Sequence, residues 1–154
     1  MAQLIIEKNK LGKAVSINKT NFGIEAENVI NQYMKGDSNK ITKTKIRGIL
    51  DLVNKIYNRV VYLDNEELSE DLLSDIAYLQ VKLAYECGRD EEIKIKGRLT
   101  GKYKEGVRDF IDQSGMRILL DQILKSKSKE DFLLYARYVE SLIAYFKFHG
   151  GKDR

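Results

Sequence analysis

Aromatic and basic side chains alternate at helical spacing in one stretch of the sequence. The members of this stretch are Tyr78, Lys82, Tyr85 and Arg89. Their intervals of four, three and four residues place them all on one side of a helix. Lysine and arginine attract phosphates, and phenol rings pack against sugars or bases, so the stretch is a candidate surface for nucleic acid. The same spacing also fits two partly buried tyrosines with exposed cations at their rim, and the residues alone favour neither interpretation.

Residues that could carry out catalysis are few. His149 is the only histidine, and with a single cysteine in the chain there are too few ligands for a zinc site. No nucleophile motif and no phosphate-binding loop is present, so we interpret His149 as a residue at the end of a helix. Cys87 cannot form an internal disulfide, and we expect it to be a buried helical thiol. The sequence therefore predicts no enzyme activity, no cofactor and no metal.

The charges are separated along the chain. Residues 40–62 hold six basic residues and one acid, residues 94–104 hold five basic residues and no acid, and residues 64–75 hold six acids and no base. With a formal net charge of +4, this pattern favours an anionic partner, of which nucleic acid is the commonest. Solvated helix faces explain the pattern equally well.

Neither a signal peptide nor a membrane span is expected. The first apolar run covers only residues 4–6, which is too short for the core of a signal peptide. No run approaches the ~18 apolar residues of a membrane helix. Together with the single thiol, which fits a reducing compartment, this predicts a cytoplasmic protein.

The elements that position these residues are predicted to be helices, and the absence of proline permits long ones. Thr42 is a candidate N-cap for the clearest helix, because apolar residues follow it every three or four positions. These residues are Ile46, Ile49, Leu50, Val53, Ile56, Tyr57 and Val60. The next helix, over residues 66–89, is apolar around most of its circumference, which predicts a place in the middle of a bundle. The last helix begins at Ser128, in a capping-box pattern with Asp131, and stops at Gly150.

The whole chain is predicted to be all-α, a single compact bundle of five or six helices. Residues 1–22 lack clear periodicity, so we expect a loosely ordered N-terminal segment before a helical-bundle domain over residues 23–154. Residues 90–106 contain three glycines and much charge, which is typical of a mobile surface loop. Alternation of apolar and polar residues over 93–99 leaves a small hairpin as the alternative.

The sequence resembles one protein family in three stretches, which are ITKTKIRGILDLVNKIY (41–57), IAYLQVKLAYECGRD (76–90) and FLLYARYVESLIAYFKFHGGKD (132–153). Together they resemble the small, all-helical subunit of the type III-A CRISPR effector, the Csm complex. The resemblance implies an RNA-binding subunit without an active site that serves antiviral defence. Several copies would stack along the guide RNA–target RNA duplex and bind its backbone, mainly the target strand, without sequence specificity.

The resemblance also implies the partners. Besides copies of itself, they are the larger backbone subunits, which cut the target RNA, and the large signature subunit, which carries the DNA-cleaving and cyclic-oligoadenylate activities. The RNA-contacting residues that the matched stretches imply are Lys43, Lys45, Arg47, Lys82, Arg89, Lys147 and Lys152. Gly48 stands where relatives are expected to carry a basic residue, so we expect this chain to lack the RNA contact at that position. Lys55 and Arg59 are added from the polar face of the helix after Thr42, and Tyr85 from its place between two cations.

Two other functions remain open at this point. The segment TKTKIRGIL (42–50) could serve a helix-turn-helix regulator that binds duplex DNA, although the helix after Thr42 is long for a recognition helix. The acids of residues 64–75 could instead serve a helical adaptor that binds only protein.

Overall fold

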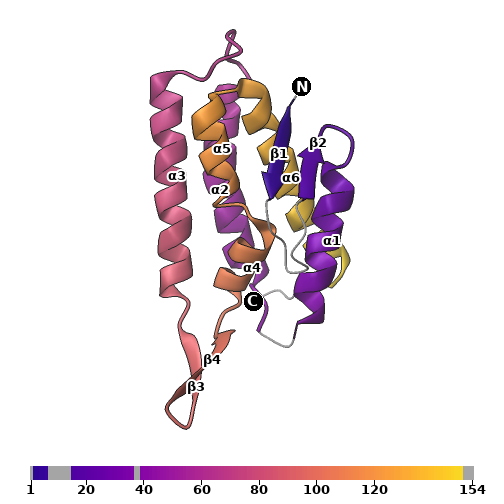
Figure 1. The fold of residues 1–154 in the computed structure, drawn as a ribbon, viewed down its shortest axis with the longest axis vertical. Helices are drawn as coiled ribbons and strands as arrows, with labels where there is room; N and C mark the ends of the chain where they lie inside the picture. Colours follow the sequence, from indigo (N-terminus) through magenta and orange to yellow (C-terminus); the bar gives the residue numbers. More distant parts are fainter. Residues whose placement is uncertain (1, 7–14, 37–38, 151–154) are drawn as a thin grey trace.

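Six helices and two short antiparallel strand pairs make up the described part of the chain, residues 2–6, 15–36 and 39–150, in a computed structural model (Figure 1). The helices are α1 (Phe22–Lys35), α2 (Lys43–Val60), α3 (Glu70–Arg89), α4 (Val107–Ser114), α5 (Leu119–Ser126) and α6 (Lys129–Phe148). The strands are β1 (Gln3–Ile6) with β2 (Val15–Asn18), and β3 (Glu92–Ile95) with β4 (Arg98–Tyr103). The mostly helical fold confirms the predicted bundle. The β1–β2 pair is an addition that we did not predict, and the β3–β4 pair lies where a small hairpin was the alternative to a loop.

Helix α6 forms the centre of the bundle, where it packs against α1, α2, α5 and β1. The Ser128 hydroxyl accepts a hydrogen bond from the N–H of Asp131, so the predicted N-cap is confirmed. Near the other end of α6, the ring of Phe146 lies 6.2 Å from that of Phe110 in α4 and 6.3 Å from that of Tyr33 in α1. This buried aromatic cluster joins the first, fourth and last helices.

Helix α2 forms as its sequence pattern predicts. The Thr42 hydroxyl accepts a hydrogen bond from the N–H of Lys45, which confirms the predicted cap. The apolar face packs inward against α6 and α3. Its buried residues are Ile46, Ile49, Val53, Ile56 and Val60. The polar face, which carries several predicted site residues, is consequently turned outward.

Helix α3 lies at the edge of the bundle, so the prediction that it occupies the middle is wrong (Figure 1). One apolar stripe, which includes Ile76 and Leu83, is buried against α2, α4 and α5. The second stripe stays in solvent, where Val81 is 60% exposed and Ala77 and Ala84 are exposed beside it. Alanine offers little apolar area, so leaving this stripe in water costs little free energy.

The start of α3 also differs from the predicted residue 66. The Ser69 hydroxyl accepts a hydrogen bond from the N–H of Leu72 and begins the helix there. The preceding residues pair instead with the connection between α5 and α6, through an isolated bridge that joins Glu67 to Ser128. This tertiary pairing keeps the segment before Ser69 extended. Because it joins distant parts of the chain, no local sequence pattern predicts it.

Residues 90–106 contain the β3–β4 hairpin, so the predicted mobile loop is wrong and its alternative, a small hairpin, is confirmed. The strands end where Ile95 pairs with Arg98. Between them, Lys96 and Gly97 both have positive φ, of 51° and 78°. This is the backbone that a two-residue type I′ turn requires, and it matches the twist of the strands.

The described part of the N-terminal segment forms the β1–β2 ladder, which contacts α6, α5 and α1. Leu4 and Ile17 are partners across this ladder, and both are fully buried. These strands differ from the loosely ordered segment that we expected, while residues 7–14 lie outside the described residues. The boundary between the segment and the bundle domain stays a prediction.

Candidate nucleic-acid interface

A groove runs between α2 and α3 on the side of the molecule where these two helices pack together. It consists of two pockets that share Leu52 and have volumes of about 230 and about 310 Å³. Half of the predicted site residues line it: Lys45, Lys55, Arg59, Lys82 and Arg89. The fold thus brings cations from two separate stretches of sequence to one surface.

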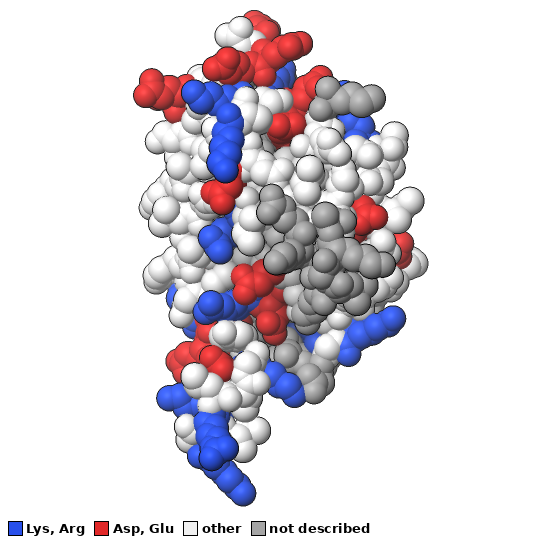
Figure 2. Space-filling model, in the orientation of Figure 1, with Lys and Arg blue, Asp and Glu red and all other residues white. Residues whose placement is uncertain are grey.

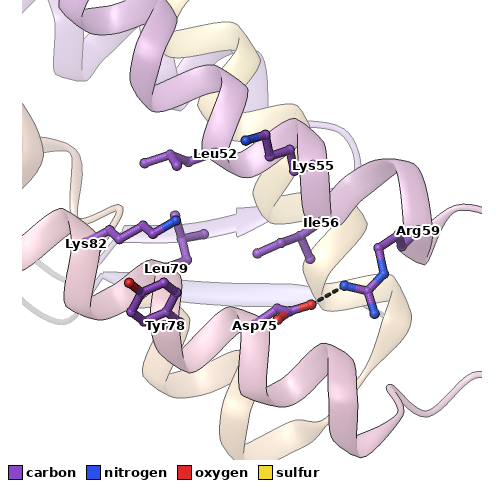
Figure 3. Close-up of a pocket in the computed structure, with 8 residues that line it drawn as sticks. All are labelled: Leu52, Lys55, Ile56, Arg59, Asp75, Tyr78, Leu79 and Lys82. Atoms are coloured by element: carbon purple, nitrogen blue, oxygen red, sulfur yellow. Dashed lines mark hydrogen bonds and ion pairs between the residues drawn. The ribbon is translucent and has the colours of Figure 1, made fainter.

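The first pocket combines an apolar floor with cations at its walls (Figure 3). The floor includes Leu52, Ile56 and Leu79. Lys55 extends from α2 and Lys82 from α3, both toward the space between the helices (Figure 3). Two ammonium groups near one partly enclosed surface repel each other and attract an anion, so this pocket is suited to a phosphate group.

Several groove cations already have carboxylate partners. The ion pairs are Arg59–Asp75, Lys45–Glu105 at 2.8 Å and Arg89–Glu86 at 3.3 Å. Their side chains are partly exposed, and pairs of this kind contribute only ~0–1 kcal/mol each. A phosphate can therefore replace the carboxylate at low cost. Lys55 and Lys82 make no ion pair with any residue that the structure describes, and they are the cations most available to an anion.

Two of the cations lie over tyrosine rings. Lys82 Nζ is 4.6 Å from the centroid of the Tyr78 ring, and Arg89 Cζ is 5.6 Å from that of Tyr85. The two tyrosines are 59% and 64% exposed, which contradicts the alternative that they are partly buried packing residues. Stacking against an exposed ring orients each cation for ~0.5–1 kcal/mol while the ring itself stays open to solvent.

The five remaining predicted site residues do not line the groove, and Tyr85, next to it on α3, is one of them. Lys43 and Arg47 lie elsewhere on α2, and Lys147 is exposed in the last turn of α6. Lys152 lies outside the described residues. Gly48 does line the second pocket, and a Cβ added to it would meet no atom within 4 Å. The first side-chain atom of a basic residue, which we expect at this place in relatives, would therefore meet no obstacle here.

The surroundings of the single histidine and the single cysteine do not resemble a catalytic site in the described part of the chain. His149 follows the last residue of α6, and its Nε2 lies 2.9 Å from Glu27 Oε2 of α1. Cys87 is buried, and this burial raises the pKa of its thiol to about 11, so the thiol stays protonated and unreactive near neutral pH. Over the described ranges of the chain, no group of three or more His, Cys, Asp or Glu side chains has a metal-binding arrangement.

Sequence reasoning missed the acids that partly neutralise the groove. The spacing of Glu86 and Arg89, three residues apart on one helix, is a signal that could have revealed their pair. Asp75 and Glu105 reach their cations from other elements, so no local pattern predicts those pairs.

Among the helices that the structure describes, none combines the length and the hydropathy needed to cross a bilayer. The fold and the groove define a small, mostly helical protein with a groove that is lined by cations from two helices. Residues 18–152 match the model of the Csm2 type III-A family, and the chain belongs to this family. The resemblance inferred from the three sequence stretches is thereby confirmed.

Several relatives carry the name CRISPR system Cms protein Csm2. The chain is 38% identical to the one from Enterococcus italicus over 111 residues, which cover 72% of this chain and 69% of the relative. It is 30% identical to the one from Streptococcus thermophilus over 135 residues, which cover 86% and 94%. The relative from Mycobacterium tuberculosis is 24% identical over 140 residues, which cover 91% and 100%.

Proposed function

We propose that this chain is the non-catalytic small subunit of a type III-A CRISPR effector complex. In this proposal, several copies stack along the guide RNA–target RNA duplex in the cytoplasm and bind its backbone without sequence specificity. The partners are further copies, the backbone subunits and the large signature subunit. Membership of the Csm2 family supports the place in the complex. The observation that carries RNA binding is the groove between α2 and α3, where two helices contribute five cations.

The composition of the groove supports backbone binding rather than base reading. Lysine and arginine contact phosphates, which are the same for every sequence. The major groove of an A-form duplex is too deep and narrow for side chains to read the bases. A surface of this kind therefore distinguishes a duplex by its shape and charge, as a subunit must when the guide differs from one complex to the next.

A single copy is expected to bind weakly. Three of the five cations exchange a carboxylate partner for a phosphate, so their net gain is small. Adjacent copies on one duplex bind with high effective concentration, and their phosphate contacts add up. Stacked copies are thus expected to bind the duplex more tightly than one copy does.

The test measures binding of the purified full chain to two RNA duplexes of unrelated sequence, long enough to seat several copies, over a series of salt concentrations. The groove variant is Lys55→Gln with Lys82→Gln, because these cations have no carboxylate partner among the described residues. The matched control is Lys125→Gln with Arg137→Gln, which removes the same charge from exposed positions on α5 and α6, outside the groove and outside the predicted site. We expect equal affinity for both duplexes, a decrease with salt, and a larger loss, of about tenfold, in the groove variant.

Other outcomes favour the other functions. Strong preference for one DNA duplex would favour the helix-turn-helix regulator, although the connection of α1 to α2 covers residues 36–42 and is longer than a helix-turn-helix allows. No binding to RNA, together with a stable complex of this chain with other Csm subunits, would favour the adaptor that binds only protein. Equal loss in the groove variant and the control would contradict the groove as the site.

A further inference from the structure

The β3–β4 hairpin carries a run of positive charge from Lys94 onward. It projects from the end of the bundle, beyond α3 and α4 (Figure 1). Figure 2 shows blue side chains gathered at this end of the molecule. From Lys94 to Lys104 there are five basic residues and no acid. None of these residues belongs to the α2–α3 groove or to the set of site residues that the sequence predicted.

Hydrogen bonds fix the base of the hairpin to the helical bundle. At its base, the N–H of Lys104 donates to the carbonyl of Glu91 at 3.0 Å, and Asn39 Nδ2 donates to the carbonyl of Lys104 at 2.7 Å. The buried carboxylate of Asp90 accepts a hydrogen bond from the N–H of Glu105 at 2.8 Å. These bonds connect the hairpin to α3 and to the segment before α2. The arm therefore presents its charge in a defined position, and binding costs less ordering entropy than it would for a mobile loop.

Within the described part of the chain, the cations at the tip are not held in ion pairs with carboxylates. Lys94, Lys96 and Arg98 are exposed and make no ion pair with any described residue. This differs from the groove, where three of the five cations are paired. An incoming phosphate has no acid to displace at the tip, so each contact there has a larger net effect than a contact with a paired groove cation.

Both faces of the ribbon carry charge. Lys94 pairs with Leu99 across the ladder and Ile95 pairs with Arg98, and neighbouring pairs point to opposite faces. Each face thus presents one cation beside one aliphatic side chain, and no continuous apolar face exists for packing against another protein. Cations on both faces fit a ribbon that lies along a groove of a duplex, with phosphates on either side of it.

We propose that the β3–β4 hairpin is a second RNA-binding arm of this chain, which contacts duplex phosphates through Lys94, Lys96 and Arg98. The inference rests on the proposed function, because it assumes the same ligand. It adds that the hairpin contributes at least as much to affinity as the groove. Since the arm continues from the end of α3 at which Arg89 lines the groove, the two sites can follow one backbone.

The test compares the full chain with a hairpin variant, Lys94→Gln, Lys96→Asn and Arg98→Gln. Asparagine is chosen at 96 because Asn-Gly is a preferred type I′ turn, which keeps the hairpin. The matched control removes the same charge from exposed positions elsewhere, as Lys19→Gln, Lys125→Gln and Arg137→Gln. Binding to a duplex RNA is measured by fluorescence anisotropy over a salt series, self-association by sedimentation, and folding by thermal melting with circular dichroism.

We expect the hairpin variant to bind RNA about 10- to 100-fold more weakly, with a salt slope smaller by about two to three, while the control stays close to wild type. Unchanged affinity of the hairpin variant, with wild type still bound, overturns this inference and leaves the groove proposal intact. Equal loss in the control also overturns it, because net charge alone then explains the effect. Loss of self-association at unchanged affinity for an isolated short duplex assigns the arm to contacts between copies and overturns it too. Absence of binding by wild type refutes the proposed function itself.

Discussion

The N–H of Val107 donates a hydrogen bond of 2.8 Å to the carboxylate of Asp90, across the base of the β3–β4 hairpin. Asp90 follows the last residue of α3, and Val107 is the first residue of α4, so one side chain joins the end of one helix to the start of the next. The same carboxylate accepts hydrogen bonds from Glu105 and Arg108. Its negative charge also lies at the positive end of α4, where a carboxylate stabilises the helix.

Replacing this carboxylate is expected to destabilise the fold. Asp90→Ala leaves three N–H groups without their acceptor, and we expect the free energy of unfolding to fall by about 2–4 kcal/mol. Asp90→Asn keeps one acceptor oxygen and should lose roughly half as much. Urea denaturation of both variants measures the effect, and a loss below about 0.5 kcal/mol for Asp90→Ala would show that the carboxylate does not hold this junction.

Two glycines near the hairpin differ in the space around them, so replacing each by alanine separates the cost of a steric clash from the cost of the backbone conformation. Gly106 and Gly101 have similar positive φ, of 70° and 75°, but a Cβ on Gly106 would lie 2.1 Å from the backbone oxygen of Asn39, whereas one on Gly101 meets no atom within 4 Å. Gly101→Ala should cost only about 1–2 kcal/mol, the penalty of the left-handed conformation. Gly106→Ala should cost about 3 kcal/mol or more, because the backbone of the neighbouring segment must move. Thermal melting of the pair checks this, and equal melting temperatures would refute the close approach.

A buried tyrosine of α6 holds the turn between α4 and α5. The Tyr138 hydroxyl donates to the carbonyl of Ser114 at 2.6 Å, and both residues are fully buried. Tyr138→Phe leaves that carbonyl without this donor, so we expect the free energy of unfolding to fall by about 1–3 kcal/mol. Tyr145→Phe is the matched control, since its hydroxyl has no hydrogen bond among the described residues, and it should stay within ~0.5 kcal/mol. Chemical denaturation compares the two, and a similar loss in both would contradict the role of the Ser114 bond.

The buried thiol predicts a decrease of stability in alkali. Burial raises the pKa of Cys87 to about 11, whereas the unfolded thiol keeps its ordinary, lower pKa. Between these values the unfolded chain loses its proton and the folded chain keeps it, so unfolding becomes more favourable as pH rises. We expect the thiol to contribute a loss of about 1–2 kcal/mol between pH 8 and pH 10. Urea denaturation of wild type and Cys87→Ala at both pH values isolates the contribution of the thiol. If the free energy of unfolding changes equally with pH in both proteins, the thiol has no such effect.

Local pattern was sufficient for much of the helical framework. Thr42 and Ser128 could be recognised as caps because the groups that they satisfy lie three residues away, within the same turn of helix. The buried face of α2 could be read from its periodicity, because a continuous apolar stripe must leave water wherever the helix is placed. The tyrosines and cations of α3 were placed on one side of that helix for the same geometric reason.

Contacts between distant segments determined the rest. The edge position of α3 depends on which of two apolar stripes finds partners, and the small side chains of the second, such as Ala77, make its exposure inexpensive. The meeting of Lys55 with Lys82, and the neutralisation of Lys45 by Glu105, follow from how α2, α3 and the hairpin are packed. Residues 90–106 became an ordered arm because Asp90 satisfies N–H groups of residues 105–108. Periodicity describes one helix or strand at a time, whereas these features arise from side chains on different elements and depend on their relative placement.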